Sequence, residues 1–254
     1  MHRMYDVVTS EESSVPGLPG KVVLRPDHDD VVDTLAADLF MQAQACVRTF
    51  GNFHLAVSAT PACEPLLLRL MVDPQVRSLP WGRTHVWLCD EQDGSRGRLL
   101  HEYWGDHAGV PESQFHLIPG ADHGGAEAYD ALLRQTLAWR EPGHDRLDAV
   151  LLSIDALGFV ASLAPGEPSD DERLIRAGAD AAGVMTASMT RRLINASRLV
   201  AVLASGEDGR RGLERVRDEL AGGEQRSPGT WLSPVGGELR WYMERASMPR
   251  QVHG

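Results

Sequence analysis

LDAVLLSIDALGFVASLAPG, residues 147–166, carries the strongest fold signal in the chain. Asp148–Ile154 is a short run rich in aliphatic residues, and Gly158 separates it from Val160–Leu163. This pattern predicts a buried strand, a tight loop and the first turn of a helix. In an open α/β sheet, ligands bind at such a junction because the carboxyl ends of strands and the amino ends of helices converge there.

The rest of the chain alternates between strand-like and helix-like segments. Strands are expected at Val22–Leu24, Phe53–Ser58, Thr84–Cys89, Phe115–Ile118, Asp148–Ile154, Val184–Ser188, Leu199–Ala204 and, as a last ordered segment, Glu238–Met243. The first helix is expected to run from Asp27, which can cap its free amides, to about Thr49. Further helices are expected at Leu66–Met71, Leu99–Trp104, Ala126–Arg140 and Glu207–Leu220. Gly166–Asp180 is expected to be a charged loop. This order predicts an α/β fold with a mostly parallel β-sheet and helices on both faces, of the Rossmann-like kind.

Length and composition favour one domain. Residues 1–20 are polar and end in Pro-Gly-Leu-Pro-Gly, so we expect an irregular N-terminal arm. A chain of 254 residues with 43% hydrophobic residues can bury a substantial core, as one large domain or two smaller ones. We favour a single domain over residues 21–254.

The charge of the chain limits its partners. The formal net charge is −11, and this argues against a nucleic-acid or acidic-membrane surface, because both need clustered Lys and Arg. A small anionic ligand is still compatible with this balance if a few arginines gather locally.

The cysteines and the N-terminus indicate the compartment. Cys46, Cys63 and Cys89 are odd in number and too far apart for a metal knuckle or a redox pair, so we expect buried free thiols in a reducing compartment. Met1–Val8 shows no cationic segment followed by an apolar core, and no run approaches the ~20 apolar residues of a membrane span. We expect a soluble cytoplasmic protein without a cofactor.

Histidine and serine give no recognisable catalytic or metal motif. His101, His107, His116 and His123 lie within one third of the chain but lack the spacing that lets adjacent ligands converge on one ion. We therefore expect surface and loop histidines and no metal site. Ser162 lacks the Gly-x-Ser-x-Gly elbow of a nucleophile, so we expect it to bond to backbone at a helix start.

Charged residues offer a few further candidates. Asp90 and Glu91 follow a strand, where two adjacent carboxylates can shift each other's proton affinity, so they are candidates for a catalytic role. Guanidinium groups suit phosphate oxygens, but solvated helix charges are the simpler reading of the densest basic residues, Arg191, Arg192, Arg198, Arg210 and Arg211. Asp155, the only ionisable side chain in the central loop, is expected to cap the following turn.

The order of these segments resembles the 6-phosphogluconolactonase family, which is related to glucosamine-6-phosphate deaminases. The resemblance covers about residues 22–243 and implies the family's α/β fold. The family's "SGGSTP", "GDER" and "GxGxDGHTASLFPG" correspond to Ser58–Cys63, Cys89–Gln92 and Ser153–Gly166. Its "LxxLNxAR", "TG" and closing "GELxWF" resemble the segments at Leu193–Arg198, Ser205–Gly206 and Gly237–Tyr242.

The chain departs from the family at the residues that carry the chemistry. The resemblance implies that the histidine of "DGH" is a general base that activates water against a lactone carbonyl, which requires a proton affinity near neutral pH. Phe159 occupies that position and Leu157 occupies the position of the aspartate. Neither side chain can take a proton. We expect Phe159, Leu157, Val160 and Ala59 to fill the cleft with apolar volume, leaving it smaller than the family's.

The implied anion site is altered as well. A glycine-rich loop lets backbone amides approach a phosphate closely, whereas Ala59-Thr60-Pro61 adds side chains and removes one donor. The arginine of "DER" is Gln92, the asparagine of "SNY" is Arg96, and the lysine near the last helix is Gly209, with Arg210 beside it. The ligand-binding positions implied by the resemblance are Ser58, Ala59, Thr60, Gln92, Arg96, Gly158, Arg198 and Arg210.

Two functions follow as hypotheses. The first is a family member with little or no lactonase activity that persists as a binding or regulatory partner, with a phosphorylated sugar acid or other small anion as ligand and a protein as a second partner. The alternative is an active sugar-phosphate lactone hydrolase in which Asp90, Glu91 or a histidine from residues 101–123 replaces the base, and Arg96 and Arg210 supply the anion site. An amino-sugar-phosphate isomerase or deaminase is less favoured. The related deaminases also use acid/base side chains in the turn that contains Leu157 and Phe159, and these two side chains cannot take a proton.

Overall fold

A computed structural model describes Val15 and residues 17–105, 107–138, 146–163, 172–179 and 183–250. Most of the expected N-terminal arm therefore lies outside the described residues, as do Pro165 and Gly166 of the "PG" match. The described end of the arm is tied to the domain, because Trp241 Nε1 donates a hydrogen bond to the Pro19 carbonyl at 2.7 Å.

Seven strands form one parallel sheet, as the sequence predicts. Their order is β1-β10-β9-β6-β2-β3-β5, and all neighbouring pairs in it are parallel. The strands are β1 (Lys21–Arg25), β2 (Phe53–Val57), β3 (Thr84–Leu88), β5 (Phe115–His116), β6 (Ala149–Ser153), β9 (Leu199–Ala204) and β10 (Glu238–Glu244). The central strands β2, β6 and β9 are buried almost throughout, which explains why they read as continuous aliphatic runs.

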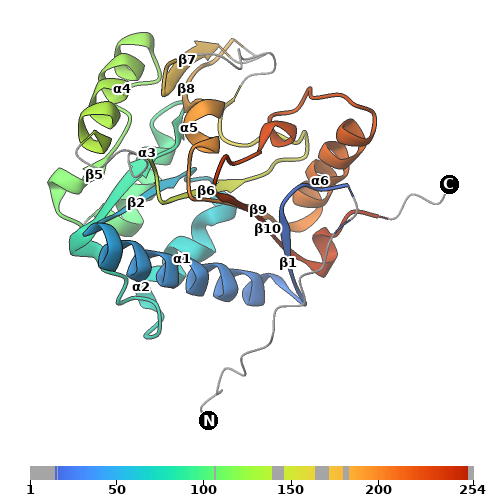
Figure 1. Ribbon diagram of the computed structural model, residues 1–254, viewed down its shortest axis with the longest axis horizontal. Coiled ribbons are helices and arrows are strands. Elements are labelled where there is room, and N and C mark those ends of the chain that lie inside the picture. The colour runs from blue at the N-terminus through green and yellow to red at the C-terminus, as the bar shows by residue number, and fades with distance from the viewer. Residues whose placement is uncertain are drawn as a thin grey trace.

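Helices cover both faces of this sheet. The helices are α1 (His28–Phe50), α2 (Glu64–Val72), α3 (Ser95–Leu100), α4 (His123–Leu137), α5 (Arg191–Asn195) and α6 (Gly206–Ala221). The chain moves along the sheet in one direction from β1 to β5 and in the other from β5 to β10, and right-handed crossovers then require opposite faces for the two halves. Figure 1 shows α1 and α2 on one side of the sheet and α4, α5 and α6 on the other.

Local signals set the helix ends. Asp27 caps α1 by accepting a hydrogen bond from the Asp30 amide at 3.0 Å, and Gly51 ends the helix with φ of 84°. Helix α4 begins three residues before the expected start, because the Asp122 carboxylate accepts from the Gly125 amide at 2.7 Å. A π-helical turn at His101–Gly105 directly follows α3 and extends it.

A second, three-stranded sheet corrects one sequence prediction. Its order is β4-β8-β7, antiparallel, with β4 (Asp90–Glu91), β7 (Ile175–Ala179) and β8 (Met185–Met189). The expected charged loop at Gly166–Asp180 thus contains a strand. In β7, the buried residues Ile175 and Ala177 alternate with Arg176. This pattern is too short to recognise in the sequence, because charged residues flank it.

The histidines also differ from expectation. His101, His107 and His123 are exposed, as predicted, whereas His54 and His116 are buried. His116 packs against the Trp87 ring with a centroid distance of 3.8 Å, and its Nε2 lies 3.1 Å from His85 Nδ1. Burial lowers the pKa of His116 to about 4. The imidazole therefore remains neutral in the folded protein at neutral and mildly acidic pH.

This imidazole makes stability depend on pH. The folded-state pKa of His116 lies below the usual value near 6.5. The contribution of the neutral imidazole to the free energy of unfolding is therefore complete above about pH 6.5 and is lost as the pH falls toward 4. We expect the wild type to lose about 2 kcal/mol more unfolding free energy between pH 7 and pH 5 than H116F, measured by urea denaturation. H107F, at an exposed histidine, is the control and should keep the wild-type slope. Equal slopes for H116F and the wild type would contradict the assignment.

Candidate functional site

Four loops meet where the parallel strands end. β2 is followed by Ser58–Thr60, β3 by Cys89 and β4, β6 by 154–163, and β9 by Ser205 at the start of α6. Because the carboxyl ends of parallel strands lie on one side of the sheet, these loops form a common rim. The rim holds most of the residues singled out from the sequence.

A buried carboxylate joins three of these loops. Asp90 has no solvent exposure, and its Oδ1 accepts a hydrogen bond from Ser58 Oγ at 2.7 Å. Its Oδ2 accepts from Ser162 Oγ at 2.7 Å and forms an ion pair with the Arg96 guanidinium. Ser162 therefore binds a side chain across the rim rather than backbone, which corrects the sequence prediction. Both oxygens of Asp90 are occupied, so the carboxylate cannot reach a substrate or a water as it stands.

Arg96 is held in the same cluster. Its Nη1 also donates to Ser162 Oγ at 3.0 Å, so one guanidinium bridges a carboxylate and a hydroxyl. Burial lowers the pKa of Arg96 from its usual value, but the ion pair with Asp90 supplies the opposite charge that a buried cation requires.

Two thiols lie close to this cluster and are unreactive. Burial raises the pKa of Cys89 to about 12 and also raises that of Cys63. Both remain neutral thiols at neutral pH, and a thiol in that state is a poor nucleophile. The prediction of buried free cysteines is confirmed for all three, including Cys46.

The second candidate acid, Glu91, caps a helix. Its Oε1 accepts from the Gln92 amide at 2.9 Å and its Oε2 from the Gly97 amide at 2.8 Å. The side chain is buried, and a Cβ at Gly97 would lie 3.1 Å from Oε2. Glu91 thus serves the free amides at the start of α3, where a negative charge is favoured.

The turn after β6 is closed by its own aspartate. Asp155 Oδ1 accepts hydrogen bonds from the amides of Leu157 at 2.8 Å and Phe159 at 2.9 Å, which confirms the expected capping role. Two amides that could face an anion are occupied by an internal one.

Glycine is required in this turn. Gly158 has φ of 77°, and a Cβ there would lie 2.9 Å from Ser227 Oγ. The Gly158 carbonyl accepts a hydrogen bond from the Gly229 amide at 2.9 Å, so the segment that follows α6 packs against the turn and holds it in place. The glycine shared with the family therefore has a structural reason in this chain.

The loop after β2 has few free donors. The amides of Ser58 and Thr60 donate to the carbonyls of Leu151 at 2.9 Å and Ser58 at 2.8 Å, and Pro61 has no amide hydrogen. Thr60 Oγ1 lies 2.8 Å from Ser153 Oγ, which links this loop to β6. Ala59 is buried.

Of the remaining predicted arginines, Arg198 lies away from the rim and Arg210 is already paired with carboxylates. Arg198 precedes β9, at the opposite, amino edge of the sheet, where its Nε donates to Asp148 Oδ1 at 3.2 Å and its guanidinium lies 4.3 Å from the centre of the Phe50 ring. Its assignment as a ligand residue of the rim is thus corrected. Arg210, on α6, is engaged by Glu207 and by Glu214.

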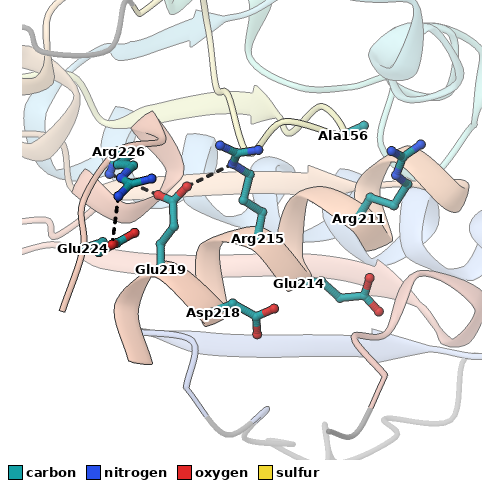
Figure 2. A pocket seen from close by; sticks show the side chains of 8 residues that line it. All are labelled: Ala156, Arg211, Glu214, Arg215, Asp218, Glu219, Glu224 and Arg226. Atoms are coloured by element: carbon teal, nitrogen blue, oxygen red, sulfur yellow. Dashed lines mark hydrogen bonds and ion pairs between the residues drawn. The ribbon is translucent and has the colours of Figure 1, made fainter. Parts of the chain in front are cut away.

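The cavity beside the turn is charged rather than apolar. It measures about 520 Å³ and is lined by Ala156, Arg211, Glu214, Arg215, Asp218, Glu219, Glu224 and Arg226. Figure 2 shows the guanidinium groups of Arg211 and Arg215 on the side of α6 that faces Ala156, with Glu214 and Asp218 pointing the other way.

The expected apolar filling is therefore only partly seen. Val160 and Ala59 are buried, but Leu157 is 52% exposed and fills no pocket.

Within the described ranges, no group of three or more His, Cys, Asp and Glu side chains could hold a metal ion. None of the helices in the described part of the chain has the length and apolarity to cross a membrane.

Two partners of Asp90 were missed in the sequence, whereas the role of Asp155 was predicted. Ser162 and Ser58 were not recognised as partners of Asp90, because hydrogen bonds across 72 and 32 positions of sequence leave no local pattern. The role of Asp155 was visible, since a lone carboxylate before a glycine turn is typical of such a cap.

Comparison with known proteins gives the family. A sequence profile described as "Glucosamine-6-phosphate isomerases/6-phosphogluconolactonase" matches residues 26–241. The human "GDH/6PGL endoplasmic bifunctional protein" is 28% identical over 245 residues, which cover 85% of this chain and 28% of that protein. The chain thus spans less than a third of that relative's length. "Probable 6-phosphogluconolactonase 1" of Oryza sativa subsp. japonica is 24% identical over 262 residues, covering 95% of this chain and 87% of the relative.

Solved structures share the fold. The crystal structure of 6-phosphogluconolactonase from Thermotoga maritima superimposes with a TM-score of 0.73 at 18% identity, covering 88% of this chain and 99% of that chain. The enzyme from Trypanosoma cruzi gives a TM-score of 0.75 at 16% identity, covering 91% of this chain and 96% of that chain. Since the sequence profile covers most of the chain and the fold agrees along its length, this chain belongs to the glucosamine-6-phosphate isomerase/6-phosphogluconolactonase family.

Proposed function

We propose that this chain is a 6-phosphogluconolactonase-family protein with little or no lactonase activity, which acts as a binding or regulatory partner in the pathway of its relatives. One observation carries the proposal. At the turn after β6, Phe159 stands at the position of the family's base, and Asp155 occupies the amides of Leu157 and Phe159. A general base typically contributes about 10²–10⁴ in rate, and neither Leu157 nor Phe159 can take a proton, while Asp155 is engaged by the amides of its own turn.

The alternative of a rearranged active site finds little support. Asp90 is buried and accepts from Ser58 and Ser162 of two other loops, and Glu91 is buried and accepts from amides of its own segment. Of the histidines in residues 101–123, His116 is buried against the Trp87 ring, and His101, His107 and His123 are exposed on other segments of the chain. A base must come within hydrogen-bond reach of the proton that it removes.

The ligand class follows from the family. A phosphorylated sugar acid or another small anion is the expected ligand, and guanidinium groups would recognise its phosphate. In this chain Arg96 pairs with Asp90, and Arg210 pairs with Glu207 and Glu214. An incoming phosphate must compete with these carboxylates, so we expect weak binding at the rim.

The first test is the parent reaction. Purified protein is mixed with freshly generated 6-phosphogluconolactone, and ring opening is followed by acid release, with the Thermotoga maritima enzyme assayed alongside. We expect kcat/KM at least about 100-fold below that enzyme, because the general base is absent. A value within tenfold of it would overturn the proposal.

The second test separates structural from catalytic roles of Asp90. In D90N the buried Arg96 loses its counter-ion, so we expect unfolding to become about 3 kcal/mol easier in urea titrations. D93N, at an exposed carboxylate three residues away, should change stability by less than about 0.5 kcal/mol. If the wild type opens the lactone faster than the spontaneous rate, D90N and D93N should open it at the same rate as the wild type. A D90N protein that keeps wild-type stability but loses a measurable activity would instead support Asp90 as the replacement base.

A further inference from the structure

A second cavity lies away from the rim described above. It measures about 710 Å³ and is lined by Arg134, Leu137, Ala138, Arg146, Leu174, Arg192, Leu193, Ala196 and Val235. Arg146, Ala196 and Val235 precede β6, β9 and β10, so the cavity opens at the amino edge of the parallel sheet. Figure 1 shows its walls, α4, β7 and α5, grouped on one side of the molecule. We call it the arginine-lined pocket.

The lining combines cations with aliphatic surface. Three of its nine residues are arginines and the other six are Leu, Ala or Val, and none of these described lining residues is acidic. That balance contrasts with the cavity beside Ala156, where four acids face three arginines. It also contrasts with the chain as a whole, whose net charge is −11. A local excess of positive charge in such a chain attracts an anion.

Two of the arginines differ in what holds them. Arg134 is fixed, because its Nε donates to Asp130 Oδ2 at 2.5 Å and its Nη2 to the Glu172 carbonyl at 2.6 Å. Arg192 is exposed at the start of α5, and its side chain forms no hydrogen bond or ion pair with any described residue. Its guanidinium is therefore the group most ready to bind an external anion bidentately.

Hydrogen bonds join the walls of the pocket to one another. Thr190, which caps α5, donates its amide to the Leu174 carbonyl at 2.9 Å, and the Val235 amide donates to the Asn195 carbonyl at 2.9 Å. Arg146 Nη1 donates to the Gly236 carbonyl at 3.2 Å. The walls from β7, α5 and the loop before β10 are thus fixed before any ligand arrives, which lowers the entropic cost of binding.

We propose that the arginine-lined pocket binds a small amphipathic anion, a carboxylate, sulfonate or phosphate attached to an apolar body. The volume lies within the about 300–1,000 Å³ that is usual for small-molecule sites. Arg192 meets the anionic group, with Arg134 and Arg146 adding positive charge, and Leu137, Leu193 and Val235 cover the apolar body. A bare inorganic anion leaves the aliphatic lining unused and binds more weakly. This site is separate from the rim and holds whether or not the chain hydrolyses a lactone.

The test uses 8-anilinonaphthalene-1-sulfonate, whose sulfonate and aromatic rings match both parts of the lining. Fluorescence titration of the folded wild type should give saturable binding, and R192E should weaken it at least about tenfold, because a carboxylate then faces the sulfonate. R211E makes the same charge change at an exposed arginine of α6 and should bind as the wild type does. Circular dichroism melts of all three proteins check that each is folded.

Competition separates the apolar and the charged contributions. Octyl phosphate should displace the dye at concentrations at least about tenfold lower than inorganic phosphate, because only the former covers the aliphatic lining. V235E, which places a carboxylate over that lining, should weaken the dye and octyl phosphate together. Unchanged affinity in R192E, an equal loss in R211E, or inorganic phosphate competing as well as octyl phosphate would each overturn the proposal.

Discussion

The carboxylate of Asp90 is the constraint on which the rim of this protein depends. It is fully buried, and a buried charge is tolerated only when a counter-ion and hydrogen-bond donors surround it. Ser58 comes from the loop after β2, Ser162 from the loop after β6, and Arg96 from the helix that follows β4. Satisfying one carboxylate therefore fixes the relative positions of three loops that are far apart in sequence.

The same pattern recurs around the rim. Glu91 takes the free amides at the start of α3, Asp155 takes those of its own turn, and Arg210 is held by two glutamates of α6. A site for an external anion needs donors that no internal group has occupied. In this chain, acidic side chains accept from amides and a guanidinium of the rim that could otherwise bind an external anion. The proposed function therefore has a second support beside Phe159, because donors of the rim are already engaged in internal contacts.

The sequence was sufficient for the fold because the signals that define it are local and repeated. Aliphatic strands alternating with amphipathic helices specify a parallel sheet, and residues 147–166 predict the central β6 strand and its turn. β7 was missed because its two buried residues, Ile175 and Ala177, sit between charged neighbours. Arg198 was misplaced because a motif gives the order of residues but not the edge of the sheet on which they fall. The Asp90 cluster could not be predicted, since its contacts span 32 to 72 positions and depend on the finished sheet.

Amide hydrogen exchange at the turn after β6 tests most directly whether internal carboxylates occupy the donors of this rim. The account predicts that the amides of Leu157 and Phe159 exchange slowly in the wild type and quickly in D155A, because Asp155 Oδ1 accepts from both. It further predicts that inorganic phosphate shifts these two amide resonances only in D155A. Fast exchange in the wild type, together with phosphate-induced shifts of both resonances, would contradict the account.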